Sequence, residues 1–411
     1  MPAPTCRSCG AALEHTFADL GVSPLANAYL AAEELEAPES FYPLHARVCT
    51  GCWLVQLPAA VPPEAIFSEY AYFSSYSESW LAHADRFAAA AVERFALGPG
   101  SRVVEVASND GYLLAAFQRR DVPVLGIEPA ANVARVAEER GIATRVRFFG
   151  RACAAELAGE GRRADLLVGN NVFAHVPDLH DFTAGLAALL APGGVLSLEF
   201  PHLQRLVEGN QFDTIYHEHY SYFSFGAARR VLAGHGLEVF DVAELPTHGG
   251  SLRVLARRQG DGGEPVAAHV EELAARERAL GYETLAPYAG FAARVQAAKR
   301  RLLAFLIAAR ESGRRVVGYG APAKGNTLLV FSGVGPDLLE YTVDRSPHKQ
   351  GRYLPGSRIP IHAPERILAD RPDHVLILPW NLREEIAAQM AAVRDWGGSF
   401  LVAIPELEEL A

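Results

Sequence analysis

The strongest constraint on the fold of this chain is a repeated order of short apolar run, polar turn and helix. After Arg102, an apolar run of strand length ends in a polar turn, and a helix is predicted from Tyr112 to Arg119. Further runs of strand length, separated mostly by helical spacing, cover residues 122–127, 143–148, 164–169 and 195–200. Strands that alternate with helices build parallel sheets. We therefore predict an α/β fold with a Rossmann-like sheet in the middle of the chain.

The same order returns near the C-terminus. Arg315 begins an apolar run that leads through a glycine turn into a helix ending near Leu329, and later strands are predicted at 339–343, 373–378 and 399–404. A chain of 411 residues exceeds one ordinary core. We expect three domains, with a helix pair over 265–312 that connects the last two. The expected boundaries are 1–75, 76–258 and 259–411.

Charge and composition narrow the choice of partner. The formal net charge is −10, whereas a protein that mainly binds nucleic acid needs a basic face. The sequence has no run of about 18 apolar residues and no apolar segment after a basic start. We expect a cytoplasmic protein with no nucleic-acid or membrane partner. The oligomeric state stays open, a monomer included.

Two cysteine pairs predict a metal site in the first domain. Cys6 and Cys9 form one C-x-x-C knuckle, and Cys49 and Cys52 form another. Four thiolates complete a tetrahedral zinc site and leave no position for water, so this zinc should be structural. Two redox pairs are the alternative. The remaining cysteine, Cys153, is expected to be a core thiol.

A tyrosine-rich stretch follows the second knuckle. It carries Tyr70, Tyr72 and Tyr76 just before the middle domain. These phenols either pack the first domain onto its neighbour or form a lid that reaches cofactor and substrate, and one lid could do both.

The first turn of the middle domain predicts a ligand site. It is not a G-x-G-x-x-G fingerprint, and its acids suit a cation better than a pyrophosphate. The next strand ends in Glu128-Pro129, where an acid can take both ribose hydroxyls. Asn109 and Asp110 are also expected to cap the following helix. The predicted cofactor residues of this turn are Glu105, Ser108, Asn109, Asp110 and Gly111.

The segment from Asp213 to Tyr222 is the richest in chemistry. Tyr216, His217, Glu218 and His219 are consecutive. Imidazoles titrate near neutral pH, a carboxylate can orient one, and a phenol can stabilise an oxyanion. The segment is either a site of proton abstraction or a histidine-rich surface turn.

The glycine turn of the C-terminal domain favours an anion, because backbone N–H groups at a helix N-terminus attract negative charge and Lys324 adds a cation. We expect this domain to bind the nucleotide and pyrophosphate of a substrate, unless it keeps only a structural turn. It lacks a full dinucleotide motif, which disfavours NAD. The predicted residues are Lys324, Gly325, Asn326, Asp344, Arg345 and Lys349, with Ser251 and Arg253 between the domains as candidate phosphate contacts.

In combination, these motifs resemble a known family. The acidic turn with Glu128-Pro129 resembles the S-adenosylmethionine site of class I methyltransferases. The features that narrow it, in chain order, are the four cysteines, Asn170-Asn171 with Ala174-His175-Val176, Glu199-Phe-Pro-His202, and Tyr216-His-Glu-His219. Together they are similar to the zinc-containing sugar C-methyltransferases that act on nucleotide-bound 4-keto deoxysugars, such as the tetronitrose C-3 methyltransferases.

The resemblance implies a class I Rossmann-like methyltransferase domain between an N-terminal zinc-binding module and a C-terminal second Rossmann-like domain. It implies S-adenosylmethionine and zinc as cofactors. The implied substrate is a dTDP-4-keto-deoxysugar, methylated at C-3 through an enolate in deoxysugar biosynthesis for a natural product such as an antibiotic.

The resemblance also implies residue roles. His219 is the expected base, with His217 as its rival; Glu218 would orient an imidazole and Tyr216 would hold the oxyanion. His175 would line the same cleft unless it is a core histidine, and Tyr70 would act from the lid. Asn171 and Tyr76 are expected at the cofactor, and Tyr72 and His202 at the substrate.

Other functions remain open at this level. Methylation could occur at C-5, or on nitrogen or oxygen of another small molecule. The second glycine turn also allows an NAD-dependent sugar-nucleotide oxidoreductase. A zinc-stabilised interaction protein without chemistry is the third class.

Overall fold

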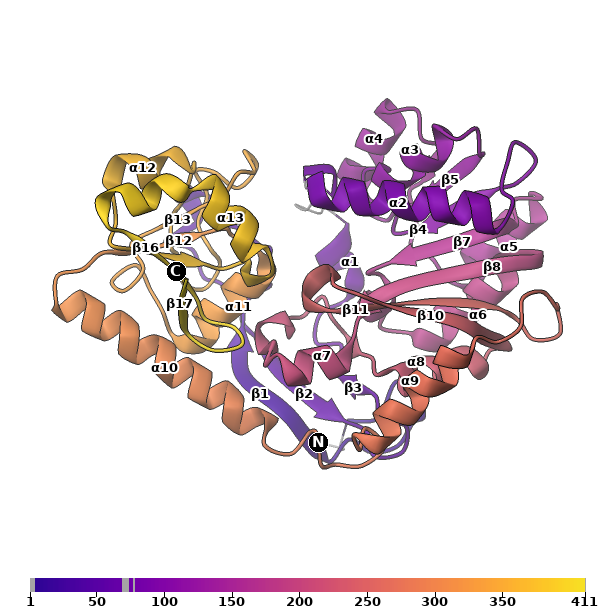
Figure 1. Cartoon of the computed structure of the whole chain (residues 1–411), viewed down its shortest axis with the longest axis horizontal. Coiled ribbons are helices and arrows are strands. Elements are labelled where there is room, and N and C mark those ends of the chain that lie inside the picture. The colour runs from indigo at the N-terminus through magenta and orange to yellow at the C-terminus, as the bar shows by residue number, and fades with distance from the viewer. Residues whose placement is uncertain (1–3, 69–73, 77, 411) are drawn as a thin grey trace.

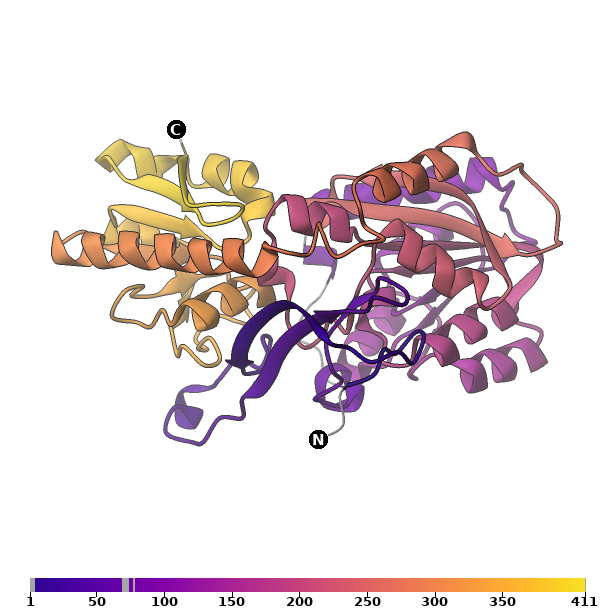
Figure 2. The same ribbon diagram turned by 90° about the horizontal axis from the view of Figure 1, so that it is seen from below.

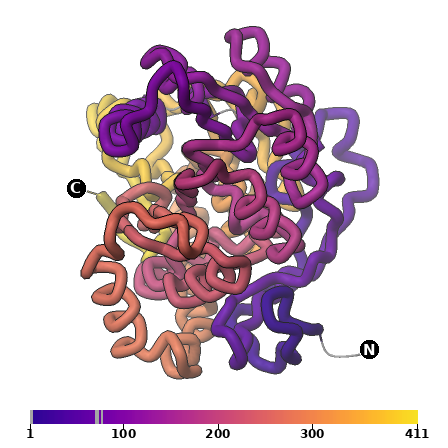
Figure 3. The backbone as a smooth tube through the Cα atoms, turned by 90° about the vertical axis from the view of Figure 1, so that its right-hand side faces the viewer, coloured from indigo at the N-terminus to yellow at the C-terminus, as the bar shows by residue number. Residues whose placement is uncertain are grey.

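Two α/β lobes lie beside each other, with an N-terminal ribbon and a long helix beneath them (Figure 1). The computed structural model describes residues 4–68, 74–76 and 78–410. Seen from the side of the middle lobe, the C-terminal lobe lies behind it and the N-terminal residues run along one flank (Figure 3). The N-terminal part is therefore placed to contact both lobes.

The middle lobe contains the predicted parallel sheet. Its strand order is β10-β11-β8-β7-β4-β5-β6, and the predicted alternation of strand and helix is confirmed. Strands β4 to β8 are parallel, whereas the β10–β11 hairpin adds an antiparallel edge. β4 is buried along its whole length because strands and helices cover it on all sides. The strands are β4 (Val103–Val106), β5 (Val124–Ile127), β6 (Thr144–Arg145), β7 (Ala164–Asn170), β8 (Leu190–Pro201), β10 (Leu237–Leu245) and β11 (Ser251–Arg258).

Helices cover the two faces of this sheet and share its core with the strands. They are α2 (Glu78–Arg94), α3 (Tyr112–Gln118), α4 (Ala131–Glu139), α5 (Arg151–Gly159), α6 (Leu179–Leu189), α7 (Leu203–Glu208) and α8 (Phe225–Ala233). Cys153 on α5 is buried, as expected for a core thiol. Short 3₁₀ turns lie at η2 (Ser74–Tyr76), η3 (Phe173–His175), η4 (Phe212–Thr214) and η5 (Thr247–Gly249).

The C-terminal lobe repeats the architecture on a smaller scale. Its strand order is β14-β13-β12-β15-β16-β17, and only the pairing of β16 with β17 is antiparallel among these described strands. The strands are β12 (Val316–Tyr319), β13 (Thr342–Val343), β14 (Ile361–His362), β15 (His374–Ile377), β16 (Ser399–Val402) and β17 (Glu408–Leu410). The helices are α11 (Ala323–Ser332), α12 (Glu365–Asp370) and α13 (Arg383–Gln389), with 3₁₀ turns η6 (Trp380–Leu382) and η7 (Ala391–Trp396).

The N-terminal part forms an antiparallel sheet with the order β1-β2-β3-β9. The last strand comes from far along the chain, directly after the histidine-rich segment, so that segment is joined to the N-terminal sheet through Val55 and Tyr222. The elements are β1 (His15–Ser23), η1 (Ala32–Glu34), β2 (Tyr42–Val48), β3 (Val55–Gln56), α1 (Pro63–Phe67) and β9 (Ser221–Tyr222).

Shared cores join the N-terminal part to both lobes. Cys6, Cys49 and Leu54 belong to the core of the middle sheet. Phe17 belongs instead to the core under the C-terminal sheet, where its ring stacks on Phe291 at 4.3 Å. Burial of apolar side chains in both cores favours one arrangement of the lobes.

Two helices connect the lobes as predicted. They are α9 (Ala268–Ala279) and the long α10 (Phe291–Glu311), which Figure 2 shows extending from the N-terminal ribbon under the C-terminal sheet. None of the helices in the described part of the chain is long and apolar enough to span a membrane.

Candidate active site

A cavity of about 490 Å³ opens where the three parts of the chain meet. Its N-terminal wall includes Asn27 and Phe67, and its C-terminal wall includes Lys324, Lys349 and Asn381. The middle lobe supplies the rest, at the carboxyl ends of its strands, where parallel sheets bind ligands. The predicted site residues that line the cavity are Asn109, Glu128, Pro129, Asn171, His175, Tyr216, His219, Lys324 and Lys349.

Glu128 organises the turn after β4. Its Oε2 accepts from the backbone N–H of Asn109 and its Oε1 from that of Ala130, both at 2.9 Å. Asn109 and Gly111 have φ of 50° and 75°, the left-handed region that asparagine and glycine tolerate best. Burial raises the pKa of Glu128 to about 7.

Buried acceptors without partners lie at this end of the cavity and behind its wall. Both carboxylate oxygens of Glu105, Oδ1 of Asp110 and Oδ1 of Asn171 have none. Burial, then the charges of Glu128 and Asp110, raise the pKa of Glu105 well above its usual value. Unpaired buried acceptors are costly unless donors arrive. The residues therefore fit S-adenosylmethionine, which brings an ammonium group, a sulfonium and ribose hydroxyls.

Several predicted cofactor residues lie behind the cavity wall. Glu105, Ser108 and Asp110 are fully buried. A Cβ at Gly111 would come within 3.0 Å of Ile142, so close packing of helix against loop requires glycine there. These residues shape the turn, and Asn109 and Glu128 form the surface.

The histidine-rich segment presents one imidazole to the cavity with its tautomer defined. Nδ1 of His219 lies 2.7 Å from the carbonyl oxygen of Thr214. A carbonyl only accepts, so Nδ1 carries the proton and Nε2 is left with its lone pair. Burial lowers the pKa of His219 to about 4, which keeps the ring neutral near pH 7. In this tautomer and charge state the ring can accept a proton at Nε2.

Two further rings surround His219. The ring centre of Tyr216 lies 4.1 Å from that of His219, and the ring centre of His175 lies 4.8 Å away. Burial, followed by the charges of His219 and His248, lowers the pKa of His175 well below its usual value. A neutral imidazole and a phenol beside the base can donate hydrogen bonds to a substrate oxygen.

Their sequence neighbours point elsewhere. His217 is buried outside the cavity lining, and its Nε2 lies 3.3 Å from the carbonyl oxygen of Pro43. Oε1 of Glu218 accepts from Nδ2 of Asn27 at 2.6 Å. The Thr214 carbonyl therefore orients His219 in the way that had been expected of Glu218, which instead joins the segment to the N-terminal part.

A cation occupies the opposite wall. Lys324 lies in the first turn of α11, its Nζ donates to Oδ1 of Asn381, and it lies 4.4 Å from the centre of the Trp380 ring. Burial lowers the pKa of Lys324 to about 8, against the opposing charge of Asp213. Oδ2 of Asp213 accepts from Nε1 of Trp380 at 2.7 Å, which joins the histidine-rich segment to the C-terminal lobe.

Other residues predicted at the substrate lie behind this wall or outside it. Asp344 forms an ion pair with Lys349 at 3.3 Å and accepts from the backbone N–H of Ala321. Gly325 packs against Leu378, and Asn326 is fully buried. Arg345 is exposed and does not line the cavity.

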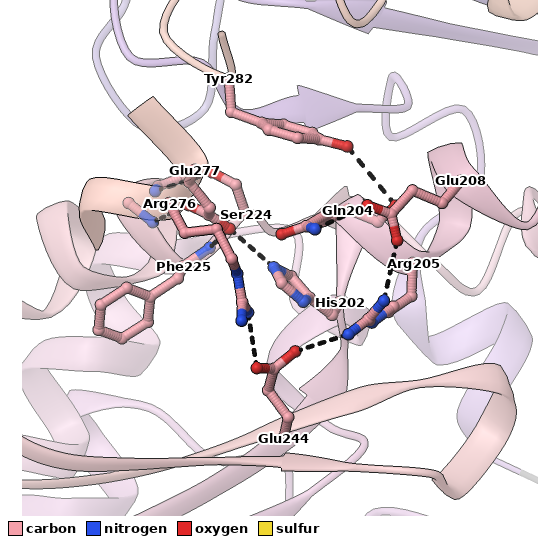
Figure 4. A network of polar contacts seen from close by, with 12 residues as sticks. His202, Gln204, Arg205, Glu208, Ser224, Phe225, Glu244, Arg276, Glu277 and Tyr282 are labelled. Carbon is pink, nitrogen blue, oxygen red and sulfur yellow. Dashed lines mark hydrogen bonds and ion pairs between the residues drawn. The ribbon is translucent and has the colours of Figure 1, made fainter. Parts of the chain in front are cut away.

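His202 lies in a separate polar network (Figure 4). Its Nε2 lies 2.7 Å from Oε1 of Glu277, and the same carboxylate accepts from the backbone N–H groups of Phe225 and Gly226 at the start of α8. The ring is fully buried, so it cannot contact a ligand in the cavity. The histidine ties α9 to the end of β8.

Ser251 and Arg253, which both belong to β11, do not line the cavity either. Ser251 Oγ donates to the carbonyl oxygen of Thr247 at 3.0 Å. Arg253 forms an ion pair with Glu199, which also contacts His83. The Ser251 hydroxyl and Nη2 of Arg253, which had been predicted to bind phosphate, therefore already have partners within the protein.

The tyrosine-rich stretch is described only in part. Tyr70 and Tyr72 lie outside the described residues, and of Tyr76 only the backbone turn is described. Their roles stay predictions.

Sequence reasoning missed His248, Asn27 and Thr214. His248 and Asn27 line the cavity. His248 stands in the stretch before Ser251 that had been recognised as lying between domains, but the strand residues were chosen instead of the turn. Asn27 and the Thr214 carbonyl carried no motif that could have found them.

The four knuckle cysteines come together as a metal site. Their sulfur atoms all lie within 4.8 Å of one another. Cys6 faces Cys52 and Cys9 faces Cys49, each pair with sulfurs 3.5 Å apart. A cluster of four thiols with no carboxylate or water position suits structural zinc.

This fold and cavity define an S-adenosylmethionine-dependent methyltransferase. Family models agree: a zinc binding domain matches residues 6–67, a methyltransferase domain matches 80–242, and a C-methyltransferase C-terminal domain matches 246–405. The C-methyltransferase NovU from Streptomyces niveus is 39% identical over 408 residues, covering 98% of this chain and 96% of that protein. The chain belongs to the zinc-containing C-methyltransferase family.

Two further similarities cover only part of the chain. The ubiquinone biosynthesis O-methyltransferase of Rhodopseudomonas palustris (strain BisA53) is 28% identical over 97 residues, which are 24% of this chain and 38% of that protein. The S-adenosylmethionine-bound magnesium protoporphyrin IX methyltransferase of Synechocystis PCC 6803 is 17% identical, with a TM-score of 0.34 over 44% of this chain and 79% of that chain.

Membership of the family settles the broad class of function. The resemblance found in the sequence is confirmed, and the oxidoreductase and interaction-protein alternatives are wrong. The boundaries at 75 and 258 stay a proposal.

Proposed function

We propose that this C-methyltransferase methylates C-3 of a dTDP-4-keto-deoxysugar through an enolate. The supporting observation is that Nε2 of His219, with its lone pair free, lies in a cavity between an acceptor-rich end and a cationic end. The pathway would be deoxysugar biosynthesis for a natural product such as an antibiotic. We place the enzyme in the cytoplasm, where thiolate ligands stay reduced.

At the acceptor-rich end, Glu128 would take the ribose hydroxyls of the methyl donor. Glu105 lies buried behind this surface with both oxygens unpaired, and a bound cation would favour its ionised form. Bound at this end, S-adenosylmethionine supplies an already activated methyl group. The protein then has to create the carbon nucleophile.

His219 would create that nucleophile. A proton next to a ketone is acidic enough for a neutral imidazole to remove when the enolate oxygen is stabilised. Nε2 accepts the proton and the C–H electron pair moves into the enolate. The Thr214 carbonyl then holds Nδ1–H of the imidazolium that forms. His217 faces Pro43 instead, which supports His219 as the base.

Tyr216 and His175 would hold the enolate oxygen. Both line the cavity beside His219. The lowered pKa of His175 keeps it neutral, so it can donate one hydrogen bond without carrying charge. Two donors in a partly enclosed cavity lower the energy of an oxyanion more than they would in water.

The cationic wall would bind the nucleotide. Lys324 lies in the first turn of a helix, where N–H groups favour phosphate. None of the described carboxylates lies within ion-pair distance of Lys324, so its charge is available to a phosphate. A diphosphate here would place the attached sugar toward the middle of the cavity.

The test is replacement of His219 by Asn, with His217→Asn as the matched control. His219→Asn should lower kcat by about 10²–10⁴-fold, because general-base catalysis contributes on that order. Binding of S-adenosylhomocysteine, measured by calorimetry, should stay unchanged. His217→Asn should keep most of the activity.

Incubation with substrate in D₂O tests the enolate and its position. The wild type should exchange hydrogen at C-3 even without methyl donor, and His219→Asn should not. Exchange at C-5 would move the reaction to that carbon. No exchange at any carbon would contradict the enolate mechanism.

A further inference from the structure

His248 lies at the cavity in an unusual pairing with Asn171. His248 is in η5, the turn between β10 and β11, and Asn171 follows β7. Their φ angles are 54° and 53°, so both adopt the left-handed conformation that side chains disfavour. Nε2 of His248 lies 3.2 Å from Nδ2 of Asn171, and both residues line the cavity.

Glu199 holds both strained residues in place. Its backbone oxygen accepts from the N–H of Asn171 at 2.7 Å, and its Oε1 accepts from Thr247 Oγ1 at 2.9 Å. The other side of the turn is equally confined. A Cβ at Gly249 would overlap the Trp380 ring, and the Gly249 carbonyl accepts from Gln211 at 2.8 Å. The surrounding structure therefore imposes the His248–Asn171 contact.

This contact determines which way the Asn171 amide faces. Nδ2 can only donate, so Nε2 of His248 must accept, which requires a neutral ring. Burial and the charge of Lys324 lower the pKa of His248 to about 4, in keeping with that state. The amide is planar, so Oδ1 faces away from His248. Oδ1 is buried and has no partner.

We propose that His248 is a positioning residue that holds the Asn171 amide so that its Oδ1 accepts a hydrogen bond from the ammonium group of the methyl donor. The inference rests on the donor placement proposed above. Without an acceptor at position 248 the amide could rotate and present its N–H₂ to the donor's cation, which would repel it.

The test compares two substitutions of His248. Phe keeps a planar ring but cannot accept, whereas Gln offers an oxygen that can accept from Asn171. His248→Phe should weaken S-adenosylhomocysteine binding about tenfold, the size of one buried hydrogen bond. His248→Gln should recover most of that loss. His269→Phe, an exposed histidine on α9, is the matched control and should bind as the wild type does.

A double-mutant cycle with Asn171→Ala shows whether His248 acts through Asn171. The pair should bind S-adenosylhomocysteine no more weakly than Asn171→Ala alone, and additive losses would overturn the proposal. Binding of the product nucleoside needs no sugar, so this result is independent of the sugar assignment.

Hydrogen exchange at the sugar in D₂O is the second readout. It should survive in His248→Phe, because the base is untouched. Loss of exchange with unchanged affinity for S-adenosylhomocysteine would make His248 part of the proton chemistry and overturn the positioning role. If His248→Phe unfolds, full affinity of Asn171→Ala would equally count against it.

Discussion

The two α/β lobes have the same local architecture and opposite charge at the cavity. In each, the first strand leads through a turn into a helix, β4 to α3 in one and β12 to α11 in the other. At the cavity the middle lobe presents Glu128, and the C-terminal lobe presents Lys324. The fold determines where a ligand binds, and the side chains of the turn determine its charge.

One pair of equivalent acids makes the difference concrete. Glu128 follows β5, the neighbour of β4, and Asp344 follows β13, the neighbour of β12. Glu128 accepts only from backbone N–H groups among the contacts described, so it can still take hydroxyls. Asp344 is neutralised by Lys349. The acid that would bind a dinucleotide ribose in the C-terminal lobe is therefore already occupied, which explains why a second Rossmann-like unit need not bind NAD.

The largest expected effect comes from zinc, because the N-terminal part packs on both lobes. Cys49→Ser should remove the metal and destabilise both binding sites together, since structural zinc contributes on the order of 10 kcal/mol to the folding of small domains. Cys153→Ser, a buried thiol outside the site, is the control. Zinc content, thermal unfolding and both ligand affinities are the measurements. Zinc-free protein that binds both ligands normally would show the lobes to be independent of this module.

The next largest effect is expected from substitutions that each weaken the binding of one ligand, because each ligand is assigned to one lobe. Glu128→Gln should weaken S-adenosylhomocysteine binding by about 10–100-fold, because hydrogen bonds to a charged acceptor are lost. Lys324→Met should weaken binding of thymidine diphosphate by a similar factor. Each substitution should leave the other ligand's affinity within about twofold, as measured by calorimetry. A loss of both affinities in either variant would contradict the assignment of one ligand to each lobe.

The smallest expected effect is on the pH dependence of ligand affinity, which should have opposite signs for the two ligands. Burial raises the pKa of Glu128 to about 7, so its carboxylate form is lost as pH falls through that value. Burial lowers the pKa of Lys324 to about 8, so its cationic form is lost as pH rises through that value. Affinity for S-adenosylhomocysteine should fall below pH 7 and affinity for thymidine diphosphate above pH 8, each by at most about tenfold per pH unit.

The corresponding variants should remove these dependences. Glu128→Gln should flatten the acid limb of the first profile, and Lys324→Met the alkaline limb of the second. If the affinities for both ligands changed in the same direction with pH, the charges of Glu128 and Lys324 would not be what distinguishes the two lobes.

Local patterns in the sequence were sufficient for the parallel cores of both sheets and for the two cofactors. Apolar runs of strand length, each followed by a turn, predicted most of the parallel strands, and the cysteine spacing predicted the metal site. The strands β10, β11, β14 and β17 were not predicted. Local patterns did not predict which way a side chain points when its direction depends on contacts with residues far along the chain. Ser251 and Arg253 carry suitable groups but lie in a strand paired with β8, and His202 meets Glu277 from a helix far along the chain.

The sequence by itself determined that this chain has two Rossmann-like units, a four-thiolate zinc site and a cluster of imidazoles, because those features depend on local period and residue chemistry. Only the tertiary structure decided which imidazole faces the cavity. His219 and His217 are two residues apart, yet the Thr214 carbonyl turns one toward the cavity with a free nitrogen and the other faces Pro43. Tautomer and direction follow from hydrogen bonds made in the folded chain, and spacing along the sequence does not contain them.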